Sequence, residues 1–345
     1  MKAPHRIGRP GQQGFSLVEL MVGVAVALVA VVVIMQVFQL SEGRRRTTTG
    51  GDDAQASGLI ASTMLQRDLR QAGQGIVHGN LLACALTLPS GRVINNLASI
   101  VVNDPDIPAG DANADTLRVA YGSGSGSPEG SRIQAQPSAN VYSVAAGRAF
   151  VQNDNVIATP EIRPLGCAAL LTTVSAAPVG NNVTTAAGAV GMSNGVLHNL
   201  GQQATARAYR VVGGRLTVCD YAAQNCTNAG AANWTPIADG IVSLRAQYGQ
   251  DTSTTMDGTV DAFNQTTPTT VCGWYRRPAV RLVLVARSGQ LEQQNVTAAA
   301  PNWAGSADTP VVLTALGNWQ RYRYKTFETT VALRNVAWQG VISGC

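Results

Sequence analysis

The residues of this chain that could carry out chemistry are few and far apart. Only three histidines occur among 345 residues, and neither His78 nor His198 has a nucleophile or an acid signature beside it. General acid–base and nucleophilic catalysis both need such groups within hydrogen-bond reach of one another. The sequence therefore predicts no catalytic residue and no cofactor, and we expect a protein that is not an enzyme. A membrane-anchored hydrolase stays the enzymatic alternative.

Six cysteines, all after residue 80, are the next candidates. Paired thiols would indicate an oxidising compartment, whereas a zinc site would need a Cys-x-x-Cys pair or a neighbouring histidine, and the sequence has neither. An even number of cysteines permits several pairings. Cys219 and Cys226 are close in sequence and are the favoured pair. Elimination then suggests two further pairs, Cys84 with Cys167 and Cys272 with Cys345, with other pairings still open.

Aspartates crowd two stretches of the chain. Calcium prefers carboxylate oxygens as ligands, but neither stretch has the spacing of an EF-hand loop. Aspartate also caps turns by accepting hydrogen bonds from nearby backbone amides. We therefore expect turn-forming aspartates and no metal site in the two groups, which are Asp104, Asp106, Asp111 and Asp115, then Asp251, Asp257 and Asp261.

The composition indicates which kinds of secondary structure hold these residues. Apolar residues make up 45% of the chain, which is enough for a sizeable core, while charged residues make up only 13%. With 36 glycines and 15 prolines, the chain suits short strands and turns rather than long charged helices. Three of the cations, Lys2, Arg6 and Arg9, lie within the first 14 residues, and without them the net charge falls from +5 to +2. We therefore do not expect nucleic acid as a partner.

An apolar stretch near the beginning of the chain predicts a membrane helix. Residues 20–41 contain no charge. As a helix they would span about 33 Å, close to the roughly 30 Å hydrocarbon core of a bilayer. A cleaved secretory signal is the rival interpretation, but the Ala-x-Ala patterns lie inside the apolar run rather than after it. We therefore expect the helix to be retained.

A carboxylate lies at the edge of this helix. Glu19 follows the junction Gly14-Phe15-Ser16-Leu17-Val18, and a charged carboxylate in lipid costs several kcal/mol unless it is paired. This junction resembles the class III signal of type IV prepilins and type II secretion pseudopilins. The resemblance implies cleavage between Gly14 and Phe15 by a prepilin peptidase and N-methylation of Phe15. The new amine of a neighbouring subunit would then pair with Glu19 and set the register between packed helices.

The helix pattern continues beyond the membrane segment after an interruption. Residues 44–51 combine three arginines, three threonines and two glycines, and we expect a kink or an unwound stretch there. From Asp53 an amphipathic pattern returns, with Leu65 and Leu69 on the apolar side, until Gly73 and Gly75 end it. The predicted segments are a cleaved leader (1–14), a transmembrane or filament-core helix (15–41), its amphipathic continuation (42–79) and a globular domain (80–345).

Short strands between turn clusters follow. The clearest signal is a hairpin of residues 206–212 and 215–219 around Gly213-Gly214, a pair that admits the positive φ of a type I′ turn. Further predicted strands lie within residues 115–121, 241–248, 280–285 and 326–333, and polar excursions within 181–195 and 252–270. Strands in succession without long helices between them favour a mainly antiparallel sheet.

Four segments of the chain resemble PilW-type minor pilins of the type IV pilus. They are residues 65–73, 239–249, 280–288 and 322–335, whereas residues 85–205 carry no such likeness and could hold an insertion. The resemblance implies an α+β, pilin-like fold, in which a long N-terminal hydrophobic spine helix precedes an antiparallel β-sheet domain with loop insertions.

The same resemblance implies a role and a location. A PilW-type protein would be a single-pass inner-membrane protein with a cytoplasmic N-terminus and a periplasmic domain, which joins the pilus at its tip or shaft. Its partners would be other minor pilins, the major pilin, prepilin peptidase, the inner-membrane assembly platform and a tip adhesin, and it would support motility and adhesion.

Two non-enzymatic alternatives stay open. One is a type II secretion pseudopilin, which shares the N-terminal signal. The other is a tip adhesin or DNA-binding module that uses exposed tryptophans beside arginines. The residues in question are Trp234, Trp274, Trp303 and Trp319 with Arg276, Arg277, Arg321 and Arg323.

Overall fold

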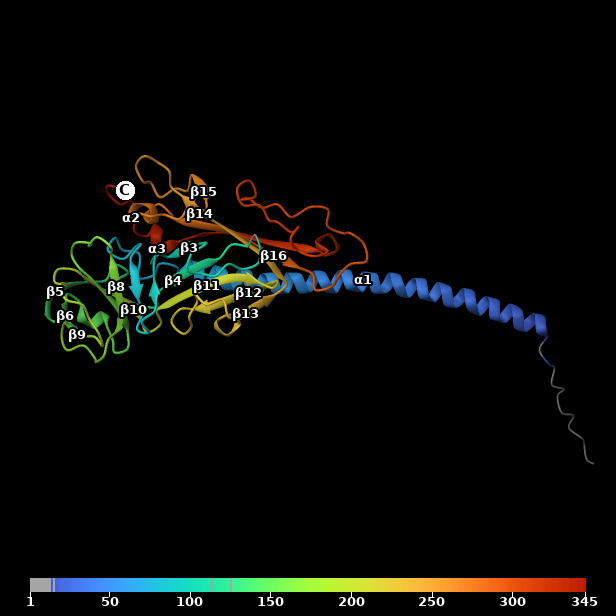
Figure 1. Ribbon diagram of the computed structural model, residues 1–345, viewed down its shortest axis with the longest axis horizontal. Helices are drawn as coiled ribbons and strands as arrows, with labels where there is room; N and C mark the ends of the chain where they lie inside the picture. The colour runs from blue at the N-terminus through green and yellow to red at the C-terminus, as the bar shows by residue number, and fades with distance from the viewer. Residues whose placement is uncertain (1–13, 15, 113, 125) are drawn as a thin grey trace, which may run out of the picture. The chain divides into compact units, whose positions relative to one another are not determined.

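The computed structural model describes residues 14, 16–112, 114–124 and 126–345, without the side chains of residues 40 and 43–49. Contacts within the chain divide it into residues 1–50 and 51–345, and each part is described by itself. The elements are a long helix, α1, and then a succession of strands with two short helices (Figure 1). This order confirms the predicted α+β class.

Helix α1 spans Leu17–Gln71. It stays helical through residues 44–51, so the expectation of an unwound stretch there was wrong. Threonine and glycine each lower helix propensity by only about 0.5–1 kcal/mol, and helix formation is cooperative, so long helical flanks can carry a weak segment. The helix ends where expected: Gly73 has a φ of +88°, and the Asn335 side chain donates to the carbonyls of Gln71 and Ala72.

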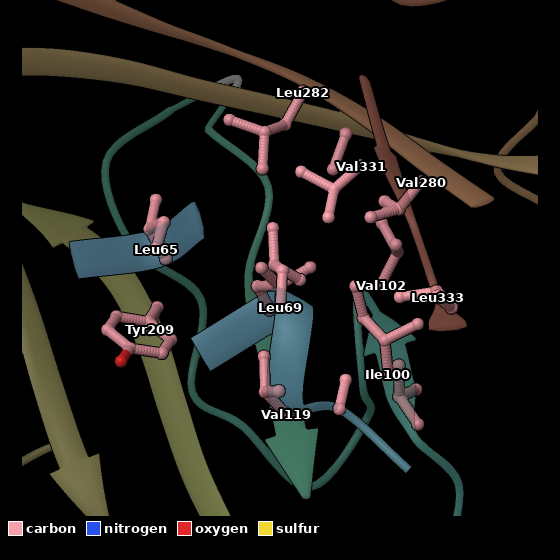
Figure 2. Close-up of a cluster of buried hydrophobic side chains, with 14 of the residues drawn as sticks. Leu65, Leu69, Ile100, Val102, Val119, Tyr209, Val280, Leu282, Val331 and Leu333 are labelled. Carbon is pink, nitrogen blue, oxygen red and sulfur yellow. The ribbon is translucent and has the colours of Figure 1, made fainter. Parts of the chain in front are cut away.

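Residues 51–71 of α1 pack one face against a core shared by two sheets. Ala61, Leu65 and Leu69 are fully buried in this core, as the amphipathic pattern predicts. Figure 2 shows Leu69 among Val102 and Val119 of one sheet and the valines and leucines of the other. The labelled partners from the second sheet are Val280, Leu282 and Val331, with Leu333 directly after its last strand.

The first of these sheets has five antiparallel strands in the order β13-β12-β11-β4-β3. The predicted hairpin is confirmed, because Val212 pairs with Arg215 and both Gly213 and Gly214 have positive φ. The Asp111 carboxylate accepts hydrogen bonds from both glycine amides at 2.9 Å. The strands are β3 (Ile100–Val102), β4 (Leu117–Tyr121), β11 (Thr205–Val212), β12 (Arg215–Asp220) and β13 (Thr235–Asp239).

The second sheet has four antiparallel strands in the order β15-β14-β16-β17. Its three long strands confirm the strands predicted at 241–248, 280–285 and 326–333, except that the last one ends at Ala332. The short strand β15 lies inside the stretch 252–270, which was expected to be a polar excursion. The strands are β14 (Ile241–Gln250), β15 (Ala262–Asn264), β16 (Ala279–Arg287) and β17 (Tyr324–Ala332). The short helices are α2 (Val271–Tyr275), α3 (Arg334–Ala337) and the 3-10 turns Gly147–Ala149, Ala231–Asn233 and Trp319–Arg321.

The middle of the chain forms a third sheet of eight strands, in the order β2-β1-β8-β7-β10-β5-β6-β9. Its β1–β8 pair is parallel, and the other pairs are antiparallel. Ile133, Tyr142, Val156 and Leu197 are buried in a separate core. The strands, several of which appear in green in Figure 1, are β1 (Ala85–Thr87), β2 (Val93–Ile94), β5 (Ser131–Ser138), β6 (Val141–Val144), β7 (Asn155–Thr159), β8 (Ala168–Thr173), β9 (Asn182–Thr184) and β10 (Val196–Gly201).

Gly58 lets α1 lie directly against β17. A Cβ at this position would come within 1.9–2.5 Å of the Phe327 ring. Ala at a helix interior normally gains about 1 kcal/mol over Gly, whereas overpacking costs roughly 1–3 kcal/mol. We therefore expect Gly58→Ala to lower the free energy of unfolding, measured by denaturant titration. In a Phe327→Ala background the same change should raise it, and a loss of stability in both backgrounds would contradict this packing.

His198 makes the stability of the third sheet depend on pH. Burial, with a further contribution from His78, lowers the pKa of His198 to about 3, from about 6.5 in an unfolded chain. The unfolded state therefore binds the extra proton between these pH values, so stability is full above about pH 6.5 and falls as the pH is lowered. From pH 7 to pH 5 the expected loss is about 2 kcal/mol. Thermal unfolding of His198→Gln should show a clearly smaller pH dependence than wild type, and an equal dependence would exclude this cause.

Candidate assembly site

The predicted processing junction lies just before α1. Gly14 is exposed and non-helical, and the helix begins at Leu17. Phe15 and residues 1–13 lie outside the described residues, so the leader, its cations and the methylated position stay predictions from the sequence.

Glu19 lies in the first turn of α1, where a negative charge interacts favourably with the helix dipole. Its side chain is exposed and has no hydrogen bond or ion pair with any residue that the structure describes. Glu19, Gly23 and Ala27 follow one another at helical spacing and, with Leu20 and Val24, line a shallow hollow on the helix surface. A Cβ added at Gly23 would meet no atom within 4 Å, so another helix can approach the backbone closely here.

The rest of this segment is uniformly apolar. Leu17–Gln39 has a mean hydropathy of 2.9, and none of it is buried within the chain. Among the described residues it is the one helix that is long and apolar enough to cross a membrane. Side chains such as Leu17 and Phe38 are 70–75% exposed. Such a surface needs lipid or the apolar helices of other subunits as its environment.

Asp68 connects the continuation of α1 to the five-stranded sheet. This carboxylate is 2% exposed and accepts hydrogen bonds from the hydroxyls of Tyr121 on β4 (3.0 Å) and Tyr209 on β11. Arg207 donates to it at 3.1 Å. Burial, and then the charge of Asp68, raise the pKa of Tyr121 to about 12 and that of Tyr209 further. Both hydroxyls therefore stay protonated and donate to the carboxylate. The sequence carried one signal of this cluster, an acid in the same helical stretch as Leu65 and Leu69.

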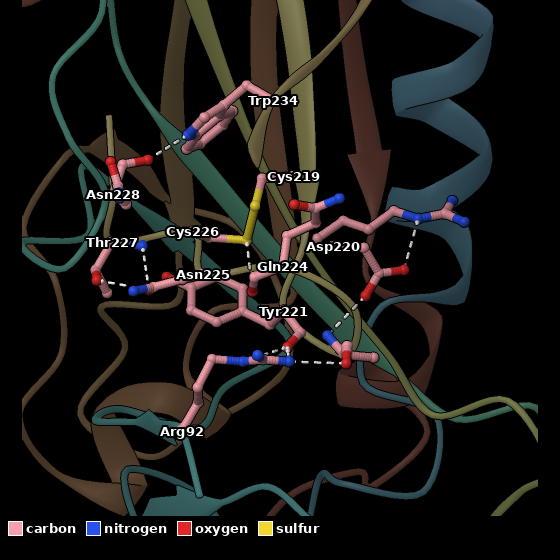
Figure 3. The surroundings of a disulfide bond; sticks show 12 residues. Arg92, Cys219, Asp220, Tyr221, Gln224, Asn225, Cys226, Thr227, Asn228 and Trp234 are labelled. Carbon is pink, nitrogen blue, oxygen red and sulfur yellow. Dashed lines mark hydrogen bonds and ion pairs between the residues drawn. A yellow bond between two sulfur atoms is a disulfide. The ribbon is translucent and has the colours of Figure 1, made fainter. Parts of the chain in front are cut away.

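The six cysteines form three disulfides, in the pairs that the sequence suggested. Cys219–Cys226 closes the turn after β12, and the nearby Arg92 guanidinium donates to the carbonyls of Tyr221 and Ala222 (Figure 3). The Trp234 indole donates to the Asn228 carbonyl beside it. The other two bonds join distant segments: Cys84–Cys167 links the start of β1 to that of β8, and Cys272–Cys345 links α2 to the last residue.

The aspartate clusters act within the fold. Asp104 pairs with the buried Arg118, Asp115 pairs with Arg245, and Asp251 accepts from three backbone amides of the loop that follows it. The bonds from backbone amides to Asp104 and Asp251 are those expected of turn-forming aspartates, whereas the ion pairs with arginines were not predicted. Among the described residues no three His, Cys, Asp or Glu side chains are grouped as metal ligands.

A serine in a hydrolase-like spacing bears on the enzymatic alternative, and the tryptophans bear on the nucleic-acid alternative. The stretch 191–195 has the Gly-x-Ser-x-Gly spacing of a hydrolase elbow, but Ser193 lies in an exposed turn before β10 and no helix follows it. Trp234, Trp274 and Trp303 are buried and Trp319 is half-buried, so they pack inside the fold instead of forming an open stacking surface.

Two family models match the chain. The model of the type IV pilus assembly protein PilW matches residues 212–335, from the end of β11 to α3, and that of the prokaryotic N-terminal methylation motif matches residues 9–35. Neither covers the eight-stranded sheet. Comparisons with curated proteins and with solved structures find no significant match. The methylation motif coincides with the Gly14 junction and the apolar helix, and the PilW match with β12, β13 and the four-stranded sheet, so over these residues the chain is similar to PilW-type prepilins with a class III signal, which are membrane-anchored pilus proteins.

Proposed function

We propose that this protein is a PilW-type minor pilin that primes pilus assembly through its exposed helix. Prepilin peptidase would cleave between Gly14 and Phe15, and the amine released on a neighbouring subunit would pair with Glu19. The observation that carries this proposal is the exposed carboxylate in the first turn of an apolar helix, with Gly23 one turn further along the same face. In a low-dielectric environment only one axial stagger of two helices would satisfy both charges, so the pair would set the register of packing.

The proposed topology follows from the same features. Residues 1–14 would lie in the cytoplasm, 15–41 in the inner membrane and then the filament core, 42–79 in the continuation of the spine, and 80–345 in the periplasm. The three disulfides support an oxidising location for the folded domain. After assembly the domain would lie at the tip or along the shaft of the pilus.

The proposed partners are the other minor pilins and the major pilin, prepilin peptidase, the inner-membrane assembly platform and a tip adhesin. Through them the protein would support pilus-dependent motility and adhesion. The match of residues 212–335 to the PilW model favours this role over that of a type II secretion pseudopilin.

Mass spectrometry of the mature N-terminus tests the proposal. In wild-type cells we expect the native protein to begin at N-methylated Phe15, and in peptidase-deficient cells at the leader. A mature chain that begins downstream of Leu40, or one that keeps residues 1–14 in wild-type cells, would rule out the proposed processing and with it the pairing of Glu19.

A further inference from the structure

A polar cleft opens in the part of the chain that neither family model covers. It has a volume of about 580 Å³, within the roughly 300–1,000 Å³ of typical small-molecule sites. Three segments enclose it: the loop after β4, the 3-10 turn Gly147–Ala149 with the residues that follow, and the end of β10. The polar side chains that line it are Ser123, Arg148, Asp154, Asn199, Gln202 and Gln203.

The floor of this cleft is held in place by hydrogen bonds. Asp154 is 4% exposed, and its Oδ2 accepts from the Val151 amide at 2.9 Å and from Asn199 Nδ2 at 2.8 Å. Asn199 also donates to the Ala149 carbonyl and accepts from the Gly201 amide, both at 2.7 Å. Oδ1 of Asp154 has no hydrogen-bond partner among the described residues. A buried carboxylate with one oxygen satisfied and the other unused is a fixed acceptor for a ligand.

The register of β10 against β7 shifts between Asn199 and Gly201, and Gly201 has a φ of +71°. This register shift is a β-bulge, which changes the direction of the strand and of its side chains. The residues at and after the bulge, Asn199 and Gly201 to Gln203, line the cleft. Asn155 donates to the carbonyls of Gly201 and Gln202 and so fixes this turn from outside. Gly124 of the loop after β4 packs directly against the end of β10, because a Cβ there would come within 2.6 Å of the Asn199 carbonyl oxygen.

The rim carries the opposite charge to the floor. Arg148 is exposed and has no ion pair among the described residues, and the exposed Gln202 and Gln203 add amide donors and acceptors. One guanidinium and one carboxylate leave the lining electrically neutral. An anion would face Asp154, a cation would face Arg148, and a lipid chain would find little apolar surface beyond Ala149 and Val151.

We propose that this cleft binds a neutral saccharide. Sugar hydroxyls both donate and accept, so they match a lining of one carboxylate, one guanidinium and several amides. Asp154 Oδ1 would accept from a sugar hydroxyl, and Arg148 would donate to a second hydroxyl or a ring oxygen. This role is separate from the proposed part in filament assembly, because no residue of the cleft belongs to α1.

The test uses the full chain, solubilised in a detergent whose headgroup is not a sugar, on an array of immobilised saccharides. The array holds neutral mono- and disaccharides, sialylated and uronic acid-containing saccharides, sugar phosphates and a lysine-rich peptide. We expect retention on one or more neutral saccharides. Titration calorimetry with the retained sugar should show binding weakened roughly tenfold by Asp154→Asn and by Arg148→Gln, since each removes a charged hydrogen-bonding group.

Arg132→Gln is the matched control, because Arg132 is an exposed arginine on β5 outside the cleft, and this variant should bind as wild type does. If Asp154→Asn fails to fold, Arg148→Gln still tests the proposal, because the exposed Arg148 side chain has no hydrogen bond or ion pair with any residue that the structure describes. The proposal is overturned by the absence of retention on neutral saccharides, by retention that both cleft variants leave unchanged, or by a preference for the anionic probes or the peptide. The assay needs no filament, so its outcome is independent of whether Glu19 pairs as proposed.

Discussion

Glu19→Ala is expected to be cleaved and inserted in the membrane normally and to abolish the contribution of this subunit to piliation. Breaking one partner of a desolvated ion pair costs about 3–5 kcal/mol, which corresponds to at least a hundredfold weaker association. The measurement is a count of pili by electron microscopy in cells whose only copy of this protein is the variant. The mature N-terminus is checked by mass spectrometry in the same cells.

Two further variants make this result specific. Glu19→Gln keeps the size of the side chain and removes its charge, so it should show the same defect as Glu19→Ala. Asp53→Asn removes another exposed acid of α1 and should leave piliation close to wild type. Full piliation with Glu19→Ala would exclude the proposed pairing. An uncleaved Glu19→Ala protein would show that Glu19 is needed for cleavage of the leader, and the assembly role would then be unsupported.

Asp68→Ala should destabilise the part of the chain from residue 51 onward by about 3 kcal/mol. The substitution leaves the hydroxyls of Tyr121 and Tyr209 buried without their acceptor, and each unsatisfied group costs about 1–3 kcal/mol. Arg207 adds little to the loss, because its side chain is 38% exposed and can turn to water. Denaturant titration followed by tryptophan fluorescence measures the change.

Asp239→Ala is the control for this prediction. Asp239 pairs with Arg215 at 2.8 Å on the surface, where both side chains are mostly exposed, and the loss should be at most about 0.5 kcal/mol. Replacing the two tyrosines with phenylalanine should remove most of the penalty of Asp68→Ala, because no buried hydroxyl then lacks a partner. A loss that is equal for Asp68→Ala and Asp239→Ala would contradict the role of this cluster.

Features that depend on neighbouring residues were predictable from the sequence. The hairpin around Gly213-Gly214 needs only the positive φ that glycine admits, and the end of α1 near Gly73 needs the same property. The buried face of α1 follows from the spacing of Leu65 and Leu69. The expectation of an unwound stretch at residues 44–51 failed because propensity is a weak local signal beside the cooperativity of a 55-residue helix.

The eight-stranded sheet was not predictable. Its strands are short, and β1 pairs with β8 across more than 80 residues, so the pairing depends on contacts that no local pattern shows. The cleft in this region was not predictable for the same reason, because Arg148, Asp154 and Asn199 come from separate segments of the chain. Asp68 could be placed on the helix, but its partners on β4 and β11 could not be identified.

The sequence alone was sufficient to predict the apolar helix and the strand character of the C-terminal third, and it placed Glu19 next to the start of that helix. These are properties of consecutive residues, whose hydrophobicity, charge and turn preference act over a few positions. Only the tertiary structure decided how the middle strands pair, which groups surround Asp68 and where the polar cleft opens. Those features form when segments far apart in the chain bury their side chains together. The free energy of that packing depends on contacts throughout the domain, so no short stretch of sequence reveals it.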